Sequence, residues 1–201
     1  MAQEKNARLR GFLKETASKG DAGAAGKAVD AEFGRDCTIM ISDFSSFLAL
    51  AKEKGIVAAL CMIEKAHEIA EPILKALGGE VLRAEPDCLV VIFTKPIDAV
   101  MAARAVSRAF EEQNRKQAGG DQLAICLGIG HGRLLVTEDR IYGEQAIITA
   151  RLGRAREGRF EVKITPEAYE GVKHLESLAF SPADAVMIGG ISITPYQLVF
   201  T

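Results

Sequence analysis

Residues 37–47 read CTIMISDFSSF, an apolar and β-branched run that ends at Ser42-Asp43. This composition predicts a buried central strand over residues 38–41, with Asp43 at its carboxyl end. The residues that follow open a predicted helix, and the first N–H groups of a helix suit phosphate oxygens. The stretch therefore predicts a carboxylate and an anion-binding helix start at one end of a central strand.

The segments after residue 43 alternate between helical and strand periods. Residues 47–77 are apolar at helical spacing, and we expect Gly55 to divide them into two helices. Residues 80–84 and 88–93 form two strand-like runs, and the Glu-Pro-Asp between them is turn chemistry typical of a hairpin. The further predicted elements are a helix over 99–113, a strand over 123–129, a Gly-His-Gly turn over 130–132, a strand over 134–137, a helix over 146–152, a strand over 160–164, a helix over 166–172 with Thr165 as its N-cap, and a strand over 196–200.

The order of these elements indicates the fold class. A strand, two helices, a hairpin, a helix and a strand follow one another from residue 38 onward. This order predicts an α/β (α+β) fold, a ferredoxin-like βααββαβ sandwich, and not a doubly wound parallel sheet.

The length of 201 residues suits one well-buried domain with a short extension. Leucine and phenylalanine recur at helical spacing near the start, which predicts an N-terminal amphipathic helix within residues 1–17. Residues 18–30 are rich in glycine and alanine and predict a flexible linker. We expect the folded domain over residues 31–201.

Composition excludes several classes of protein. The formal net charge is −2 and no basic block is present, so a non-specific nucleic-acid binder is excluded. The histidines and cysteines are too dispersed for a zinc site or a disulfide framework. No apolar run approaches the ~20 residues of a membrane span, and the start lacks the apolar core of a signal peptide, so we expect a cytoplasmic protein. The cysteines, which we predict to be buried free thiols, are Cys37, Cys61, Cys88 and Cys126.

Two aspartates carry the candidate chemistry. Asp43 ends the predicted central strand, and Asp87 lies at the tip of the predicted hairpin. Adjacent strands would bring the two carboxylates together, and such a pair favours hard divalent cations that clamp a triphosphate and activate a hydroxyl. An aspartate at a strand end and another in a turn are also ordinary structural features, so the pair alone leaves both interpretations open.

Five short motifs follow one another across residues 36–172. They are ISDFSSF at 41–47, GGEVLRAEPD at 78–87, LGIGHG at 127–132, Tyr142-Gly143 and Ala150-Arg151-Leu152. In order and spacing they resemble the motifs of the class III adenylate/guanylate (nucleotidyl) cyclase catalytic domain family, of which the chain looks like a divergent member.

The resemblance implies a domain that binds ATP or GTP and forms the 3′,5′-cyclic nucleotide, with sites shared across a head-to-tail dimer. It implies that Asp43 and Asp87 hold two Mg²⁺ or Mn²⁺ ions, and that the backbone carbonyl of Phe44 assists. It places the nucleotide near the segment Phe44, Ser45, Ser46 and Phe47.

The resemblance also assigns two arginines. Arg151 would be the catalytic residue, since it would face the charge that develops on the phosphates. Arg83 stands where the family has a base-reading lysine, and its different donor geometry leaves the base preference open. We interpret the other arginines of residues 151–159 as solvated surface and His131 as a loop histidine.

Several positions depart from the family's pattern. Ile147 stands where the family has an asparagine that orients the ribose, and Arg140, beside Asp139, stands at a base-recognition position. Residues 188–191 lack the lysine that reaches the triphosphate, and Pro86 replaces a glycine. Each missing transition-state donor typically costs about 10² to 10³ in rate.

Three functions follow from this pattern. The chain is a working cyclase, a degenerate cyclase-homology domain, or one half of an active heterodimer. Because the losses fall on the side of the site that one partner contributes, we expect a signalling domain that binds metal and ATP or GTP with weak or conditional catalysis. The alternative is a catalytically inactive pseudoenzyme that acts by dimerisation or protein–protein contacts.

Overall fold

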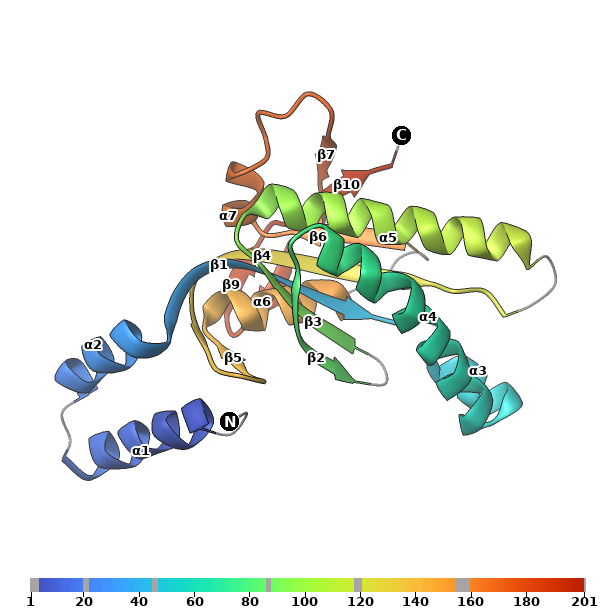
Figure 1. Ribbon diagram of the computed structural model, residues 1–201. Helices are drawn as coiled ribbons and strands as arrows, with labels where there is room; N and C mark the ends of the chain where they lie inside the picture. The colour runs from blue at the N-terminus through green and yellow to red at the C-terminus, as the bar shows by residue number, and fades with distance from the viewer. Residues whose placement is uncertain are drawn as a thin grey trace.

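The structure is a computed structural model that describes residues 4–19, 22–44, 47–85, 88–117, 121–154 and 160–200. Its centre is a mixed sheet with the strand order β2-β3-β1-β4-β6-β10-β7, in which β5 also pairs with β4 (Figure 1). The strands are β1 (Gly34–Asp43), β2 (Glu80–Glu85), β3 (Cys88–Phe93), β4 (Ile125–Val136), β5 (Ile141–Tyr142), β6 (Phe160–Ile164), β7 (Ala179–Pro182), β8 (Val186–Ile188), β9 (Ile191–Ile193) and β10 (Tyr196–Val199). The helices are α1 (Glu4–Lys19), α2 (Ala22–Phe33), α3 (Phe47–Lys54), α4 (Ile56–Ala76), α5 (Pro96–Lys116), α6 (Glu144–Arg154) and α7 (Pro166–Glu170).

The strand β1 lies at the centre of the sheet. It pairs antiparallel with β3 on one side and with β4 on the other. Residues 37–42 are buried without a break, because helices cover both faces of the sheet at this strand. The predicted central strand that ends at Asp43 is confirmed.

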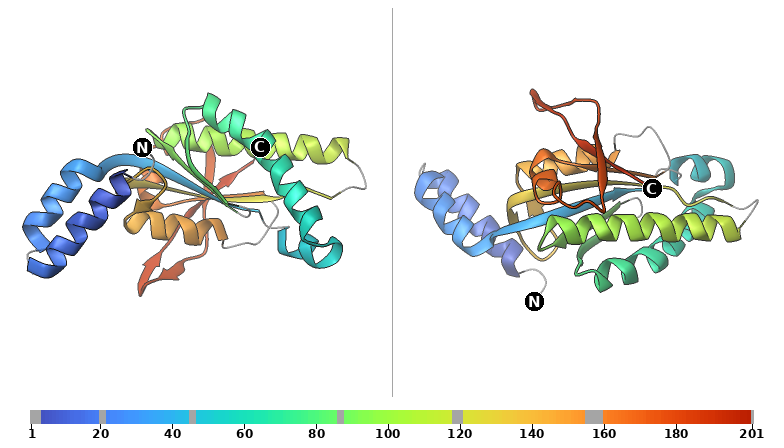
Figure 2. Two further views of the ribbon diagram at one scale, coloured as in Figure 1. Left: turned by 60° about the horizontal axis from the view of Figure 1, so that its bottom comes forward. Right: turned by 90° about the horizontal axis from the view of Figure 1, so that it is seen from above.

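Two cores lie on opposite faces of this sheet. The helices α4, α5 and α7 cover one face and α6 covers the other (Figures 1 and 2). Successive side chains of a strand point to opposite faces, so Met40 packs into the α4–α5 core whereas Ile39 and Ile41 pack toward α6. The observed order β1, α3, α4, β2, β3, α5, β4 confirms the predicted α+β sandwich.

The helices α3 and α4 meet at Gly55, whose φ of 89° favours glycine. The predicted division of residues 47–77 into two helices is confirmed, and α4 continues through Pro72. The longest described helices, α4 and α5, have 21 residues each. Neither these nor the other described helices combine the length and the apolar character that crossing a membrane requires.

The predicted Gly-His-Gly turn at 130–132 is wrong, because these residues continue β4 and pair with β1. The glycines serve close packing and not a turn. A Cβ on Gly128 would lie 2.2 Å from the backbone oxygen of Thr149, and one on Gly130 would lie 2.1 Å from the Thr149 Oγ1. His131, between Gly130 and Gly132, is a strand residue whose Nδ1 lies 2.9 Å from the Thr38 hydroxyl. The glycines therefore allow α6 to lie directly on the strand.

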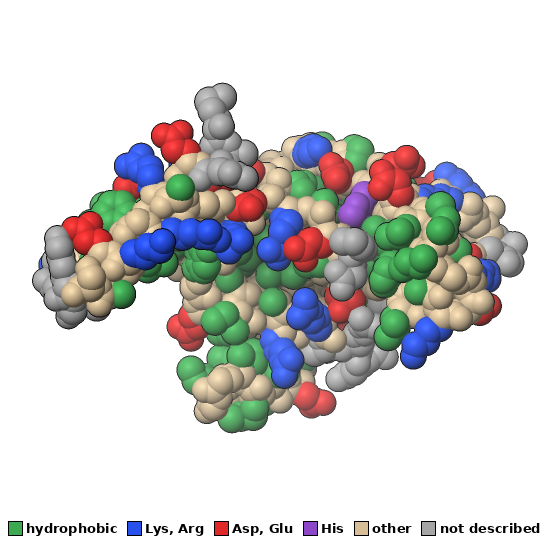
Figure 3. Space-filling view, turned by 90° about the horizontal axis from the view of Figure 1, so that it is seen from below, with side chains coloured by type: hydrophobic (Ala, Val, Ile, Leu, Met, Phe, Trp, Pro, Cys, Tyr) green, Lys and Arg blue, Asp and Glu red, His purple; other side chains and the backbone are tan. Residues whose placement is uncertain are grey.

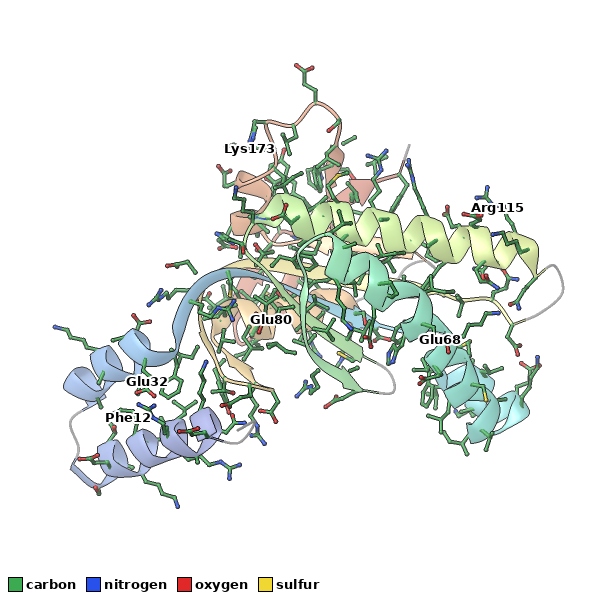
Figure 4. The ribbon with its side chains drawn as sticks, viewed as in Figure 1. Phe12, Glu32, Glu68, Glu80, Arg115 and Lys173 are labelled. Atoms are coloured by element: carbon green, nitrogen blue, oxygen red, sulfur yellow. The ribbon has the colours of Figure 1, made fainter. Side chains whose placement is uncertain are left out.

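The predicted flexible linker over residues 18–30 is also wrong for most of its length, because α2 spans Ala22–Phe33. Alanine is the strongest helix former, and the packing of α2 outweighs the presence of glycine. Val29 and Phe33 are buried against Leu9 of α1, and the rings of Phe12 and Phe33 meet edge to face at 6.3 Å. Figure 4 shows Phe12 on the side of α1 that faces α2. The helix predicted within residues 1–17 is confirmed as α1, and with α2 it forms a helical hairpin (Figure 1).

The C-terminal part contains strands that the sequence patterns did not predict. The strands β8 and β9 form a separate two-stranded hairpin, which projects from the main sheet (Figure 2). Its turn is Gly189-Gly190, with φ values of 57° and 84°. Two consecutive positive φ values match a tight hairpin turn that glycine accommodates without strain. This β8–β9 hairpin reaches the α6 face of the molecule, where it lines a groove.

We predict that Gly128→Ala destabilises the protein by about 3 kcal/mol, because the added methyl group meets the backbone of α6. The matched control is Gly132→Ala, whose Cβ would lie 3.2 Å from the flexible side chain of Gln145. Urea unfolding of the two variants measures the difference. Equal stabilities would contradict the close approach of α6 to β4.

The cysteines give a second prediction. Cys37, Cys88 and Cys126 are buried as expected, but Cys61 on α4 is exposed, which corrects the sequence expectation. Burial also raises the pKa of the Cys37 thiol. We therefore expect a thiol-alkylating reagent to modify only Cys61 in the native protein, and all the cysteines after unfolding, as counted by mass spectrometry. Cys61→Ser is the control, and native labelling of that variant would contradict the buried positions.

Candidate functional site

A groove of about 910 Å³ opens on the α6 face of the sheet. Its walls come from β1, β3 and the edge strand β2, from α6, and from β5 together with the β8–β9 hairpin. Side chains far apart in the sequence therefore meet in one place. Figure 3 views the molecule from below and shows basic side chains near the middle of this face, with hydrophobic groups on either side.

Three arginines line the groove: Arg83, Arg151 and Arg154. Arg83 comes from β2 and forms an ion pair of 3.1 Å with Glu85. Arg151 and Arg154 lie in the last turn of α6, one helical turn apart, where the negative end of the helix dipole stabilises cations. The structure thus brings together the two arginines that the resemblance assigned.

Arg154 also corrects the expectation that only Arg151 of its run faces a cleft. Residues three apart on a helix share one face, so the spacing between Arg151 and Arg154 is the signal that would have identified Arg154 as a groove residue. Arg156 and Arg159 of the same run lie outside the described residues.

Asp43 lies at the carboxyl end of β1 and is half-buried. Strand alternation places it on the same sheet face as Ile41, which lines the groove. Ser42 holds this strand end in place, since its Oγ accepts the Leu89 N–H at 2.7 Å. The predicted partner carboxylate, Asp87, lies outside the described residues, so the metal pair stays a prediction.

The residues after Asp43 show how the strand end is anchored. The side chain of Phe44 is buried between Phe110, at a ring distance of 6.4 Å, and His67, at 5.4 Å. Phe47 packs against the same core. Phe44 therefore has only its backbone to offer a ligand, and its carbonyl oxygen already accepts the Phe47 N–H at 3.2 Å. Ser45 and Ser46 lie outside the described residues.

The donor set suits a hard divalent ion in type. A carboxylate and a backbone carbonyl are oxygen ligands, which Mg²⁺ and Mn²⁺ prefer. The residues that the structure describes contain no group of three or more His, Cys, Asp or Glu side chains arranged to hold a metal. Asp43 and the Phe44 carbonyl would thus be a partial ligand set to which Asp87 adds.

The positions that depart from the cyclase pattern differ in where they lie. Ile147 lines the groove and is 65% exposed, so an apolar side chain occupies the rim. Ile188 and Gly189 line the groove from the β8–β9 hairpin, without a cation. Arg140 and Asp139 instead face α1, where Asp139 accepts a hydrogen bond of 2.5 Å from the Asn6 side chain. Of these positions, those that the structure describes in the groove lining are Ile147 and the β8–β9 hairpin, and Pro86 lies outside the described residues.

A buried ion pair on β6 escaped the sequence analysis. Lys163 Nζ lies 3.2 Å from a carboxylate oxygen of Glu161, and both side chains are only 6% exposed. The alternate residues Val162 and Ile164 belong to the α4–α5 core, so the charged pair lies on the same face as α6. In the segment FEVKI (residues 160–164) the two charged residues stand two positions apart between apolar residues, and this spacing is the signal that would have identified the pair.

No protein-family model matches the chain. Solved structures match closely in shape. The adenylate/guanylate cyclase/hydrolase from Silicibacter pomeroyi superposes with a TM-score of 0.75 at 18% identity, over 84% of this chain and 98% of that one. The adenylyl cyclase CyaB from P. aeruginosa gives 0.71 at 21% identity, over 84% and 95%. The chain has the fold of the class III cyclase catalytic domains.

The curated relatives are much longer than this chain. A serine/threonine-protein kinase, pkn2 of Myxococcus xanthus, is 23% identical over 110 residues, which are 55% of this chain and 13% of the kinase. A Rhizobium meliloti (strain 1021) protein named as a candidate adenylate cyclase is 20% identical over 157 residues, or 71% of this chain and 27% of that protein. The cyclase-fold domain thus spans about a quarter or less of the curated relatives it matches.

We predict that Lys163→Met destabilises the protein by about 3–5 kcal/mol, because it leaves the Glu161 carboxylate buried without its lysine. The matched control is Lys173→Met, which removes the lysine of an exposed Lys–Glu pair and is expected to cost less than about 1 kcal/mol. Urea unfolding measures both. A similar small cost for the two variants would contradict the burial of the β6 pair.

Proposed function

We propose that this domain binds a nucleoside triphosphate together with a divalent metal in the groove, as a signalling domain with weak or conditional formation of the 3′,5′-cyclic nucleotide. The observation that carries the proposal is the meeting of Arg83, Arg151 and Arg154 in one groove, which is also lined by Ile41, two residues before Asp43 on β1. Three cations in one groove are suited to a polyphosphate that brings its own metal.

The arginines supply the electrostatic part of this function. In cyclisation the ribose 3′ hydroxyl gives its proton to water and its oxygen bonds to the α-phosphorus, while the bond from that phosphorus to the bridging oxygen breaks and pyrophosphate leaves with the negative charge. Arg151 and Arg154, held on the rigid α6, would stabilise that charge as it develops. A bound Mg²⁺ or Mn²⁺ would supply Lewis-acid chemistry, with Asp43, Asp87 and the Phe44 carbonyl as its protein ligands.

The apolar rim explains why we propose weak catalysis. Ile147 neither donates nor accepts a hydrogen bond, so it does not orient a ribose hydroxyl. Met187 and Ile188 line the groove from the β8–β9 hairpin without adding a positive charge. Binding through the phosphates alone leaves the attacking hydroxyl free to move, and poor orientation lowers the rate.

A second cyclase domain would complete the site. Tyr142, Ile147 and Met187 line the groove and are 41%, 65% and 62% exposed, so its rim presents apolar side chains to solvent. A partner domain packed head to tail on this rim would bury them and bring its own polar groups to the nucleotide. The partner would be a second copy of this chain or a different cyclase domain.

The test is to incubate the purified protein with ATP or GTP and Mn²⁺, and to measure cyclic product and the nucleotide-dependent shift in melting temperature. We expect binding with slow turnover. Arg151→Ala should lower turnover by about 10² to 10³, because it removes a transition-state cation, and Asp43→Asn should abolish it. The control is Lys116→Ala, an exposed cation on the opposite face of the sheet.

Two outcomes separate the alternatives. Nucleotide binding without product, both alone and when mixed with another cyclase domain, would support the catalytically inactive domain that acts by protein–protein contacts. Absence of any nucleotide-dependent stabilisation would refute the binding proposal itself.

A further inference from the structure

A second hollow, of about 490 Å³, lies between α1 and the β4–β5 loop (residues 137–140). Asn6, Arg10 and Lys14 are spaced by four residues and so share one face of α1. Ala7 and Gly11 beside them are small, and a Cβ on Gly11 would meet nothing within 4 Å. We call this space the α1–loop hollow.

The two walls are held together by hydrogen bonds at one end of the hollow. The Glu138 carboxylate accepts the backbone N–H groups of Lys5 and Asn6, at 2.7 and 3.2 Å. The Thr137 hydroxyl donates to the Asn6 side chain at 2.6 Å. The hollow is therefore built by a specific contact between segments that are distant in sequence.

The charge of the α1–loop hollow is positive. Arg10 and Lys14 line it from α1, and Arg140 lines it from the loop. Among the described residues that line it, the acid is Asp139, which accepts the Asn6 hydrogen bond and lies 4.0 Å from Arg140. Within the part of the chain that the structure describes, neither Arg10 nor Lys14 forms an ion pair.

We propose that the α1–loop hollow binds a small phosphate-bearing anion, at a site separate from the groove. Its volume lies within the range typical of small-molecule sites, and planar guanidinium groups match phosphate oxygens in pairs. The site gives a function to Arg140, which faces this hollow instead of the groove. The proposal does not depend on nucleotide binding in the groove.

An anion held between the two walls would bridge α1 to the loop. The loop continues directly into β5, whose Ile141 and Tyr142 line the groove. Binding in the α1–loop hollow would therefore fix the position of β5, which is one wall of the groove. It would link the N-terminal helical hairpin to the groove.

Pyrophosphate is the probe for this site, with melting temperature as the readout and sodium chloride matching the ionic strength. We expect a rise on the order of 3 °C when pyrophosphate is about tenfold above its Kd. The double variant Arg10→Gln/Lys14→Gln should lose most of this rise, since glutamine keeps the helix propensity but removes both charges. Arg140→Gln tests the opposite wall.

A groove variant, Arg83→Gln/Arg151→Gln, separates the two sites. The proposal requires that part of the pyrophosphate effect survives in this variant and disappears when Arg10→Gln/Lys14→Gln is added. An effect that is absent in the unmodified protein, that is lost entirely in the groove variant, or that persists in the groove variant after Arg10→Gln/Lys14→Gln is added would overturn the proposal. If the α1 variant does not fold, as judged by circular dichroism, Arg140→Gln in the groove-variant background decides, with the same outcomes.

Discussion

The close contact of α6 with the central strands is the constraint on which the rest of the structure depends. A Cβ on Gly128 would enter the backbone of α6, and one on Gly153 of α6 would lie 2.8 Å from the Ile41 carbonyl oxygen. Glycines on both partners thus let backbone meet backbone without side chains between them. This contact fixes the rotation of α6, and with it the direction in which the arginines of its last turn emerge.

The groove combines exposed arginines with buried and exposed apolar side chains. The arginines suit the phosphates of a nucleotide, whereas the side chains of Ile147 and Met187 offer a ribose no hydrogen bond. Such a division separates binding from orientation, because charge attracts a polyphosphate over a distance but directional hydrogen bonds set its reacting geometry. A partner domain on the rim would supply what this chain lacks, which is why we connect activity with assembly.

The N-terminal helical hairpin, formed by α1 and α2, is connected to the sheet and to the loop beside the groove. Its small core of Leu9, Val29 and Phe33 joins it to the sheet through Leu135, and Arg133 holds Asp30 at 2.9 Å. Glu138 binds the first amides of α1, so a loop next to the groove also caps a helix far upstream. Movement of the α1–α2 helical hairpin would therefore shift β5, because the β4–β5 loop that contacts α1 continues directly into β5.

The sequence by itself determined the order of most elements and the class of the fold. The periods of residues 38–93 are strong, because β1 and β3 are buried on both faces and α4 has one apolar face. The short motifs around Asp43 and Arg151 indicated the cyclase resemblance, which the solved structures confirm at the level of the fold. These features depend on residues that are close in sequence, so they can be predicted without knowledge of tertiary contacts.

Only the tertiary structure decided how the ambiguous segments are used. Gly130 and Gly132 are equally suited to a turn or to close packing, and the position of α6 selects the strand. Residues 22–30 contain both helix-forming alanines and flexible glycines, and packing of Val29 against Leu9 selects the helix. Arg154, expected on the solvated surface, lines the groove, whereas Arg140, expected at a base-recognition position, faces α1. The physical reason is common to all these cases: the intrinsic preferences are nearly balanced, and contacts between segments distant in sequence supply the free energy that chooses between them.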